Sequence, residues 1–559
     1  MKNIITLLSF LFFSLLIQAQ VGINTTDPKG TLDVTSVNNT GLVLPRVTNV
    51  ESVTDGNGNP PVDGTIVFDM SRNSTCFYQN SKWVCIEEDG SGQLTLNEII
   101  SINYDSSSNI DYIKASNTAT DDYLGWRVSL SDDGNTMAVG ARQRSSNAGA
   151  VYIFIRTGTT WSQQAFITAS NTNASDFFSN SLSLSGDGNT LAVGAFGEDS
   201  SATGINGNEA DNSASDSGAV YVFTRTGTTW SQEAYIKASN AEGDDDFGWS
   251  VALSYDGNTL AVGARSEASN ANGVNGDQTN NSSLSSGASY IFTRVGTTWS
   301  QEAYLKASNT SLFIFFGHSV ALSDDGNTLA VGANFESTTV SQSGAVYVFT
   351  RSGTTWSQEA FLKASNPGNG YTFGDSISFS SDGNIMAVGA MREGSATSGI
   401  DGDQTDSSAY GAGAVYLFSR SGTIWTQTVY FKASNSGANY NFGTSISLSN
   451  NGNALLVGSN REASNATGVN GNQNNTSASN SGAAYIFIND GSVWTQHAYL
   501  KASNTDGSDR FGTGVSISGT GELLAVGAYS ERSNATGING NQTNNSLLNA
   551  GAVYVYSSN

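Results

Sequence analysis

Seven copies of one repeat fill most of this 559-residue chain. A Lys-Ala-Ser-Asn string or a close variant ends at Asn117, Asn171, Asn240, Asn309, Asn366, Asn435 and Asn504. A Gly-Ala-Val-Tyr-Val-Phe string or a variant begins at Gly149, Gly218, Gly287, Gly344, Gly413, Gly482 and Gly551. A short repeat cannot bury its apolar face alone, so consecutive copies must stack on one another.

Each repeat predicts four short strands separated by turns. In one copy these strands are expected at 249–254, 259–264, 287–294 and 298–307, bounded by Gly, Asn and Asp. Four strands per unit, seven times over, predict an all-β chain. We expect a seven-bladed β-propeller of four-stranded antiparallel blades over residues 109–559.

The two ends of the repeat array complement each other. The last repeat stops at Asn559 without its fourth strand, and an unpaired fourth strand, Asp111–Ala115, precedes the first repeat. Pairing the two would remove two exposed sheet edges. We therefore expect the N-terminal strand to close the ring.

The repeat resembles the bacterial FG-GAP family, which is related to the propeller of integrin α subunits. Phe-Gly stands at Phe247-Gly248, Phe316-Gly317, Phe373-Gly374, Phe442-Gly443 and Phe511-Gly512, and Gly-Ala follows in the second strand, as at Gly263-Ala264. The resemblance implies a seven-bladed propeller and extracellular recognition. It also implies an acidic calcium hairpin, but here that hairpin is cut to short turns such as 132–135. Calcium needs six to eight oxygens, so its site is not carried over to these turns.

The N-terminus predicts export. Lys2, an apolar run from Ile4 to Ile17 and a small residue at Ala19 are typical of a secretory signal peptide, assigned to residues 1–19. The sequence offers no other long apolar run, so we expect a soluble protein that is secreted or displayed at the cell surface, without membrane insertion.

A small β module is expected at residues 20–92, with a linker at 93–108. Its segments Val21–Asn24, Leu32–Val34, Gly41–Arg46 and Gly64–Phe68 resemble an N-terminal module of exported surface and fibre-like proteins of Gram-negative bacteria. Cys76 and Cys85 flank a predicted hairpin whose turn is Asn80-Ser81. The register places them opposite each other, which favours a disulfide in an oxidising compartment; the alternative is two free thiols.

The charge of the chain excludes some partners. With 48 acidic and 24 basic residues, it repels phosphate backbones and anionic lipid headgroups, so we expect no nucleic-acid partner. Such a surface suits cations, or neutral ligands such as glycans.

One face of the predicted propeller carries the sequence variation. The position after Phe-Gly does not repeat, and it holds Trp126, Asn180, Trp249, His318, Asp375, Thr444 and Thr513. Because repeating residues build the blades, this non-repeating ring is the candidate ligand site, and its Trp, Asn, Asp and His side chains suit a sugar or a peptide. The alternative is a solvated rim that tolerates any residue.

Five loops on the same face have equal lengths and carry a shared glutamate, at Glu198, Glu267, Glu393, Glu462 and Glu531. They also share Gly-Ile/Val-Asn/Asp-Gly. One interpretation is a calcium site of Glu and Asn or Asp oxygens. The other is a structural loop with an apolar anchor and a tight turn.

Two further observations bear on function. The apolar link Leu312–Phe316 indicates either a contact surface or a segment folded over a neighbouring loop. The chain has 2 His residues and no recognisable catalytic motif, so it is predicted not to be an enzyme. We expect an extracellular binding or adhesion protein for a glycan or protein ligand. A surface scaffold without a small ligand and, third, a glycan-active enzyme are the alternatives, and the oligomeric state stays open.

Overall fold

The computed structural model describes residues 102–559 throughout and parts of the first 101 residues. These parts are 21–23, 32–34, 44–48, 50, 53–54, 61, 65–70, 74–79, 82–88 and 94–99. The predicted signal peptide and the Asn80-Ser81 turn lie outside the described residues. The chain divides into two compact units, Met1–Ser101 and Ile102–Asn559.

The N-terminal unit contains two small sheets. Strand β1 (Val21–Ile23) pairs in parallel with β2 (Leu32–Val34). A five-stranded sheet has the order β3 (Arg46–Val47), β4 (Ile66–Asp69), β5 (Ser74–Gln79), β6 (Lys82–Glu88), β7 (Leu94–Ile99). Strand β7 corrects the expected linker at 93–108: its alternating Leu94, Leu96 and Glu98 residues pair with β6 and extend the sheet.

The predicted hairpin register is present in β5 and β6. Cys76 pairs with Cys85 and Tyr78 with Trp83, and the two cysteines form a disulfide. Both cysteines are fully buried, and the Tyr78 and Trp83 rings meet edge to face at 5.3 Å. The cross-strand disulfide and the aromatic pair form the small core of this sheet.

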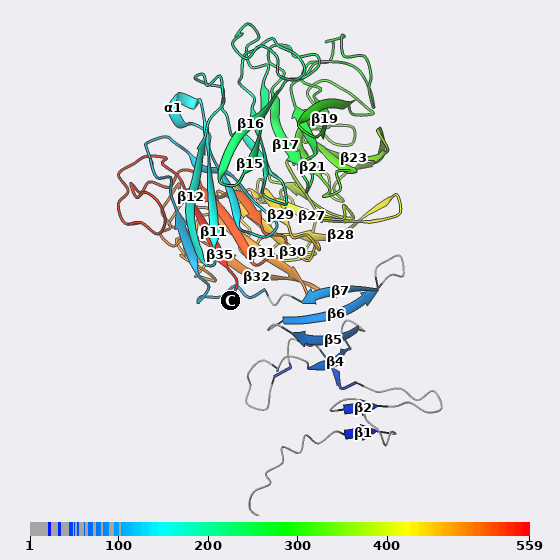
Figure 1. Cartoon of the computed structure of the whole chain (residues 1–559), viewed down its shortest axis with the longest axis vertical. Helices are drawn as coiled ribbons and strands as arrows, with labels where there is room; N and C mark the ends of the chain where they lie inside the picture. Colours follow the sequence, from blue (N-terminus) through cyan, green and yellow to red (C-terminus); the bar gives the residue numbers. More distant parts are fainter. Residues whose placement is uncertain are drawn as a thin grey trace, which may run out of the picture. The chain divides into compact units, whose positions relative to one another are not determined.

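The C-terminal unit consists of seven four-stranded antiparallel sheets. Figure 1 shows them following one another in sequence order, from cyan β11 and β12 through green and yellow to red β35. The first six are β9–β12 (Leu124–Leu130, Thr136–Ala141, Ala150–Thr157, Thr160–Ile167), β13–β16 (Ser181–Leu184, Thr190–Ala195, Ala219–Thr226, Thr229–Ile236), β17–β20 (Phe247–Leu253, Thr259–Ala264, Ala288–Val295, Thr298–Leu305), β21–β24 (Phe316–Leu322, Thr328–Ala333, Ala345–Ser352, Thr355–Leu362), β25–β28 (Ser376–Phe379, Ile385–Ala390, Ala414–Ser421, Ile424–Phe431) and β29–β32 (Phe442–Leu448, Ala454–Ser459, Ala483–Asn489, Trp494–Leu500). A four-residue segment, α1 (Arg144–Asn147), lies between β10 and β11.

The seventh sheet joins the two ends of the array. It has the order β33 (Phe511–Ile517), β34 (Leu523–Ala528), β35 (Ala552–Ser557), β8 (Ile110–Ile113). Val553 pairs with Ile113 and Tyr556 with Ile110. The strand expected at 111–115 therefore occupies the vacant fourth position, shifted by about one residue.

Glycine contacts explain why the repeat carries Phe-Gly and Gly-Ala. A Cβ built on Gly194 would stand 2.0 Å from the carbonyl oxygen of Gly248 in the next sheet, closer than any side chain tolerates. The same contact links Gly263 to Gly317 and Gly527 to Gly125. The two motifs thus allow the first strand of one sheet to touch the second strand of the sheet before it.

Backbone hydrogen bonds also connect the sheets at the turn after each first strand. Asp132 N donates to Gly186 O at 3.0 Å, and Gly519 N donates back to Asp132 O at 2.9 Å. The bonds between them run Asp187 to Tyr255, Tyr255 to Asp324, Asp324 to Ser381, Ser381 to Asn450 and Asn450 to Gly519. Every sheet takes part in this series, which returns to the sheet where it began.

Candidate functional site

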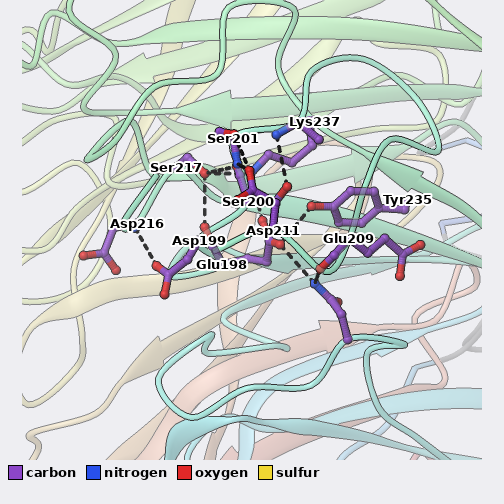
Figure 2. Close-up of polar contacts among 12 residues, drawn as sticks. Glu198, Asp199, Ser200, Ser201, Glu209, Asp211, Asp216, Ser217, Tyr235 and Lys237 are labelled. Carbon is purple, nitrogen blue, oxygen red and sulfur yellow. Dashed lines mark hydrogen bonds and ion pairs between the residues drawn. The ribbon is translucent and has the colours of Figure 1, made fainter. Parts of the chain in front are cut away.

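The five predicted calcium glutamates are buried and paired with lysine. Figure 2 shows Glu198 facing Lys237. The distance between Glu198 Oε2 and Lys237 Nζ is 2.8 Å. The other pairs are Glu267–Lys306 at 2.7 Å, Glu393–Lys432 at 2.7 Å, Glu462–Lys501 at 2.9 Å and Glu531–Lys114 at 2.9 Å. Each lysine comes from the Lys-Ala-Ser-Asn string of the same sheet, and the ten side chains are at most 1% exposed.

Further hydrogen bonds surround the Glu198–Lys237 pair. Around Glu198, Tyr235 Oη donates to Oε1 at 2.8 Å and Asn171 Nδ2 donates to the same oxygen at 3.0 Å. Lys237 Nζ also donates to Ser217 Oγ at 2.7 Å. Because Asn171 ends the preceding repeat, its bond ties one sheet to the next, and the complete shell stabilises a buried charge pair.

This arrangement corrects the calcium interpretation of Glu198, Glu267, Glu393, Glu462 and Glu531. The ammonium of a lysine stands where the bound cation was expected, and burial lowers the pKa of Lys237 while Glu198 opposes the shift. Among the described residues, three or more His, Cys, Asp or Glu side chains nowhere gather as a metal site would require.

Comparison of the repeats supports a structural role for the pair. A sixth pair, Glu336–Lys363 at 2.7 Å, lies in a shorter loop that the length criterion missed. The first repeat has Arg144 at the glutamate position and Thr168 at the lysine position, so both partners are replaced together. Arg144 instead pairs with Asp122.

The long loops pack on their own sheets. The apolar residue of each Gly-Ile/Val-Asn/Asp-Gly segment forms a bridge to the fourth strand, as Ile205 does to Ile236 and Val274 to Leu305. The next residue adopts a left-handed conformation, with φ of 55° at Asn206 and 54° at Asn275. The apolar anchor and the positive-φ turn predicted for these loops are both present.

The non-repeating residues after Phe-Gly lie close to one another around one end of the sheets. Trp249 and His318 have ring centroids 6.0 Å apart, and His318 Nε2 lies 3.7 Å from Asp375 Oδ1. Asn180 Nδ2 donates to Trp249 O at 3.1 Å. A second set of residues contacts the remaining three members of this group, Trp126, Thr444 and Thr513.

That second set is the position after Gly-Ala, which the sequence analysis missed. It holds Arg142, Phe196, Arg265, Asn334, Met391, Asn460 and Tyr529, and it fails to repeat just as the first set does. We call both sets together the mouth cluster. The criterion that found the first set, variation between copies, would have found the second.

Contacts within the mouth cluster pass through all seven sheets. Tyr529 meets Trp126 at 5.1 Å, Arg142 lies 5.6 Å from the Phe196 ring, and Phe196 meets Trp249 at 5.0 Å. Beyond the Trp249, His318 and Asp375 contacts, Thr444 Oγ1 lies 3.9 Å from Met391 Sδ, and Asn460 Nδ2 lies 3.4 Å from Thr513 Oγ1. The contacts therefore join each sheet to the next at this end, where the seven predicted residues gather.

A pocket of about 260 Å³ opens in this cluster. Its lining includes Arg265, His318, Asn334, Asp375 and Arg392. Asn334 Nδ2 donates to Asp375 Oδ1 at 2.8 Å, and Thr372 Oγ1 donates to Asp375 Oδ2. Burial raises the pKa of Asp375 to about 6, and burial with the nearby Arg265 lowers the pKa of His318 to about 3, so at neutral pH the carboxylate is ionised and the imidazole is neutral.

Each of the two interpretations holds for part of the apolar link Leu312–Phe316. Leu312 and Phe313 are about half exposed, whereas Ile314 and Phe316 are buried. Phe315 packs on Phe335 at 5.2 Å beside the pocket. The link thus contributes to the core and to the pocket wall, and leaves two side chains at the surface.

Repeated sheets, interlocking glycines and one mouth of varied side chains define a β-propeller repeat protein. The chain belongs to the FG-GAP repeat family, whose model matches residues 108–154, 161–223, 230–292, 299–349, 425–487 and 494–556, more than half of the chain. Residues 22–101 match the model of the phage tail like trimerisation region.

Among solved structures, the WD40 repeats of RRP9 align with a TM-score of 0.46 and 8% identity, covering 82% of this chain and 100% of that one. The search of curated proteins found no match. Within the described residues, none of the helices has the length and apolarity needed to span a membrane.

Proposed function

We propose that this protein is an extracellular binding or adhesion module whose ligand, a glycan or a protein, sits on the mouth cluster. The proposal rests on one observation: the residues that differ between repeats gather at one end of the sheets. Trp126, Trp249, His318 and Asp375 stand at a position whose residue varies between the sheets, yet they lie close to one another beside a pocket. Variable positions that converge around a pocket are typical of binding sites on repeat scaffolds.

We propose further that the seven sheets are the blades of one closed ring. The series of backbone bonds from Asp132 around to Gly519 and the packing of Gly125 on Gly527 support closure between the first and last sheets. Leu130 N also donates to Ser516 Oγ across the same junction at 3.0 Å. A closed ring gives the mouth cluster a rigid frame, which lowers the entropy cost of binding.

Export and a non-enzymatic role belong to the same proposal. The sequence of residues 1–19 and the Cys76–Cys85 disulfide support passage through an oxidising compartment. In the mouth cluster the single histidine is neutral and held beside Asp375, and the FG-GAP propeller serves as a binding platform. A scaffold without a small ligand is the alternative that the binding experiment tests.

The N-terminal unit supports a role in assembly. We propose that it joins three copies of the chain, because residues 22–101 match a trimerisation region. Three linked mouths would raise avidity for a repetitive surface. Light scattering on the purified chain tests this: a mass near three times 58.3 kDa is expected, and a monomer would contradict it.

A glycan array with matched tryptophan variants tests the binding proposal. The full mature chain should bind a subset of glycans, and Trp249→Ala should lose that binding. Trp230→Ala is the control, because Trp230 lies near the β15–β16 turn at the other end of the strands, where its Nε1 donates to Gln164. Equal binding by the wild type and Trp249→Ala would refute the mouth as the binding site.

A further inference from the structure

We propose that the mouth cluster recognises an anionic sugar, with its acid group held by the arginines and its ring by the aromatic side chains. This inference deepens the binding function proposed above and rests on it. It reverses the expectation from overall composition, because a chain with a net charge of −24 gathers Arg127, Arg142, Arg265 and Arg392 at one mouth.

Most of these guanidinium groups lack an acidic partner. Of the four, Arg265 alone forms an ion pair with a described carboxylate, Asp246, at 2.8 Å. Arg142 instead lies over the rings of Trp126 at 4.6 Å and Phe177 at 4.8 Å, and its buried Nε has no hydrogen-bond partner. Arg127 donates to the backbone oxygen of Trp126 at 3.4 Å and lies 5.4 Å from the centroid of the Trp126 ring.

Like charges in this cluster repel one another. Burial and the neighbouring Arg265 lower the pKa of Arg142 to about 10, so the group remains charged at neutral pH but is poorly solvated. An anion that supplied the missing charge-assisted hydrogen bonds would offset this cost, and a planar guanidinium matches a carboxylate in two-point geometry.

The surrounding side chains favour a sugar as the carrier of that anion. The Phe196 and Trp249 rings stand 5.0 Å apart beside Arg265, which lies 3.1 Å above the Trp249 ring centroid. Because Arg265 covers Trp249, the apolar walls open to a sugar ring are those of the neighbouring pocket. Phe315, Phe335 and Met391 form these walls, against which the C–H groups of a pyranose can pack. Within the pocket, Asp375 and Asn334 offer acceptors for hydroxyl groups, so the acid group is expected toward the arginines and the hydroxyls toward Asp375.

Calorimetric titration of the full chain with matched ligands tests the proposal. The probes are oligogalacturonates, the same oligomers as methyl esters, sulfated galactan oligomers and a glutamate-rich peptide. We expect the acid form to bind at least about tenfold more tightly than the ester, and higher salt to weaken the acid form only. The sulfated probe shows whether the site reads carboxylate alone or any anion on a sugar.

Arginine variants test whether the mouth cluster causes the preference for the acid form. Arg142→Gln and Arg265→Gln should each lower the affinity for the acid form at least about tenfold while leaving the ester unchanged. Arg225→Gln is the control, since Arg225 hydrogen-bonds Asn189 at the opposite end of the sheet. If one mouth variant fails to fold, the other variant and the salt dependence still show whether the arginines bind the acid group.

The possible results separate the two proposals. Equal binding of acid and ester, with loss in Trp249→Ala, would overturn the anion inference and leave the binding function standing. Binding of the peptide without any sugar would also overturn it. The absence of binding by every sugar and peptide in both experiments would contradict both proposals.

Discussion

Gly527 in the last sheet lies against the carbonyl oxygen of Gly125 in the first, 2.0 Å from where a Cβ would stand. Gly527→Ala should therefore force the two sheets apart and lower the free energy of unfolding by about 1–3 kcal/mol. Urea denaturation measures the loss. Gly507→Ala is the control, because its nearest neighbour is 3.6 Å from the added Cβ, and an equal loss in both variants would contradict a specific contact.

The Glu267–Lys306 pair should be strongly coupled. Glu267→Gln leaves a fully buried ammonium without its counter-charge, and we expect about 3–5 kcal/mol of destabilisation. The double variant Glu267→Gln, Lys306→Met should recover part of that loss, since no uncompensated charge remains. A double-mutant cycle in urea measures the coupling, and additive losses would show that the pair does not act as a unit.

Calcium should not stabilise the protein through the long loops. Lysine occupies the cation position beside Glu198 and its counterparts, so removal of calcium with EDTA should leave the melting temperature of the C-terminal unit unchanged. Addition of calcium should likewise have no effect. A rise in melting temperature that Glu198→Gln abolishes would restore the calcium interpretation.

Acidification should stabilise the fold through buried aspartates in the links between sheets. Burial, followed by nearby carboxylates, raises the pKa of Asp245 to about 8, and burial raises that of Asp509 to about 8. The folded state therefore holds protons that the unfolded state releases near pH 4, so stability falls as pH rises from about 4 to about 8.

The variant Asp245→Asn isolates this contribution. It keeps an acceptor for the backbone N–H of Glu242 but cannot ionise. Its melting temperature should exceed that of the wild type at pH 8 and approach it at pH 5. The same difference at both values would contradict the assigned pKa shift.

Strand β8 should be needed for the last sheet. Removal of residues 1–101 ends at the boundary between the two units and should leave the C-terminal unit folded. Removal of residues 1–115 also deletes β8 and Lys114, which exposes the edge of β35 and leaves Glu531 without its ion pair. Thermal unfolding should show a large loss only in the second truncation, and two similar profiles would contradict the role of β8.

The residues that repeat between copies allowed the strands to be predicted from the sequence. Alternation and turn residues placed four strands per copy to within about two residues, because each copy repeats the same pattern of burial. The length of the array and the fragment at 111–115 led to the correct pairing of β8 with β35.

The sequence did not allow the ion-pair partners of the repeated glutamates to be predicted. The glutamates and the lysines of Lys-Ala-Ser-Asn stand 39 residues apart in most copies, and their spacing alone cannot show that they meet. Their joint replacement by Arg144 and Thr168 in the first repeat was the available signal. At the mouth, half of the cluster was found, and the arginines were missed because total charge hid a local excess of the opposite sign.

The position of β8 has a consequence for synthesis of the protein. Strands β9 to β35 emerge from the ribosome in order, but β8 is made first and pairs with the strand made last. It must stay without its partner while the other sheets form, so the last sheet gains its fourth strand only after β35 has been made. Until that pairing forms, the facing edges of β8 and β35 are open to other strands, so assembly of the last sheet is the folding step most exposed to aggregation.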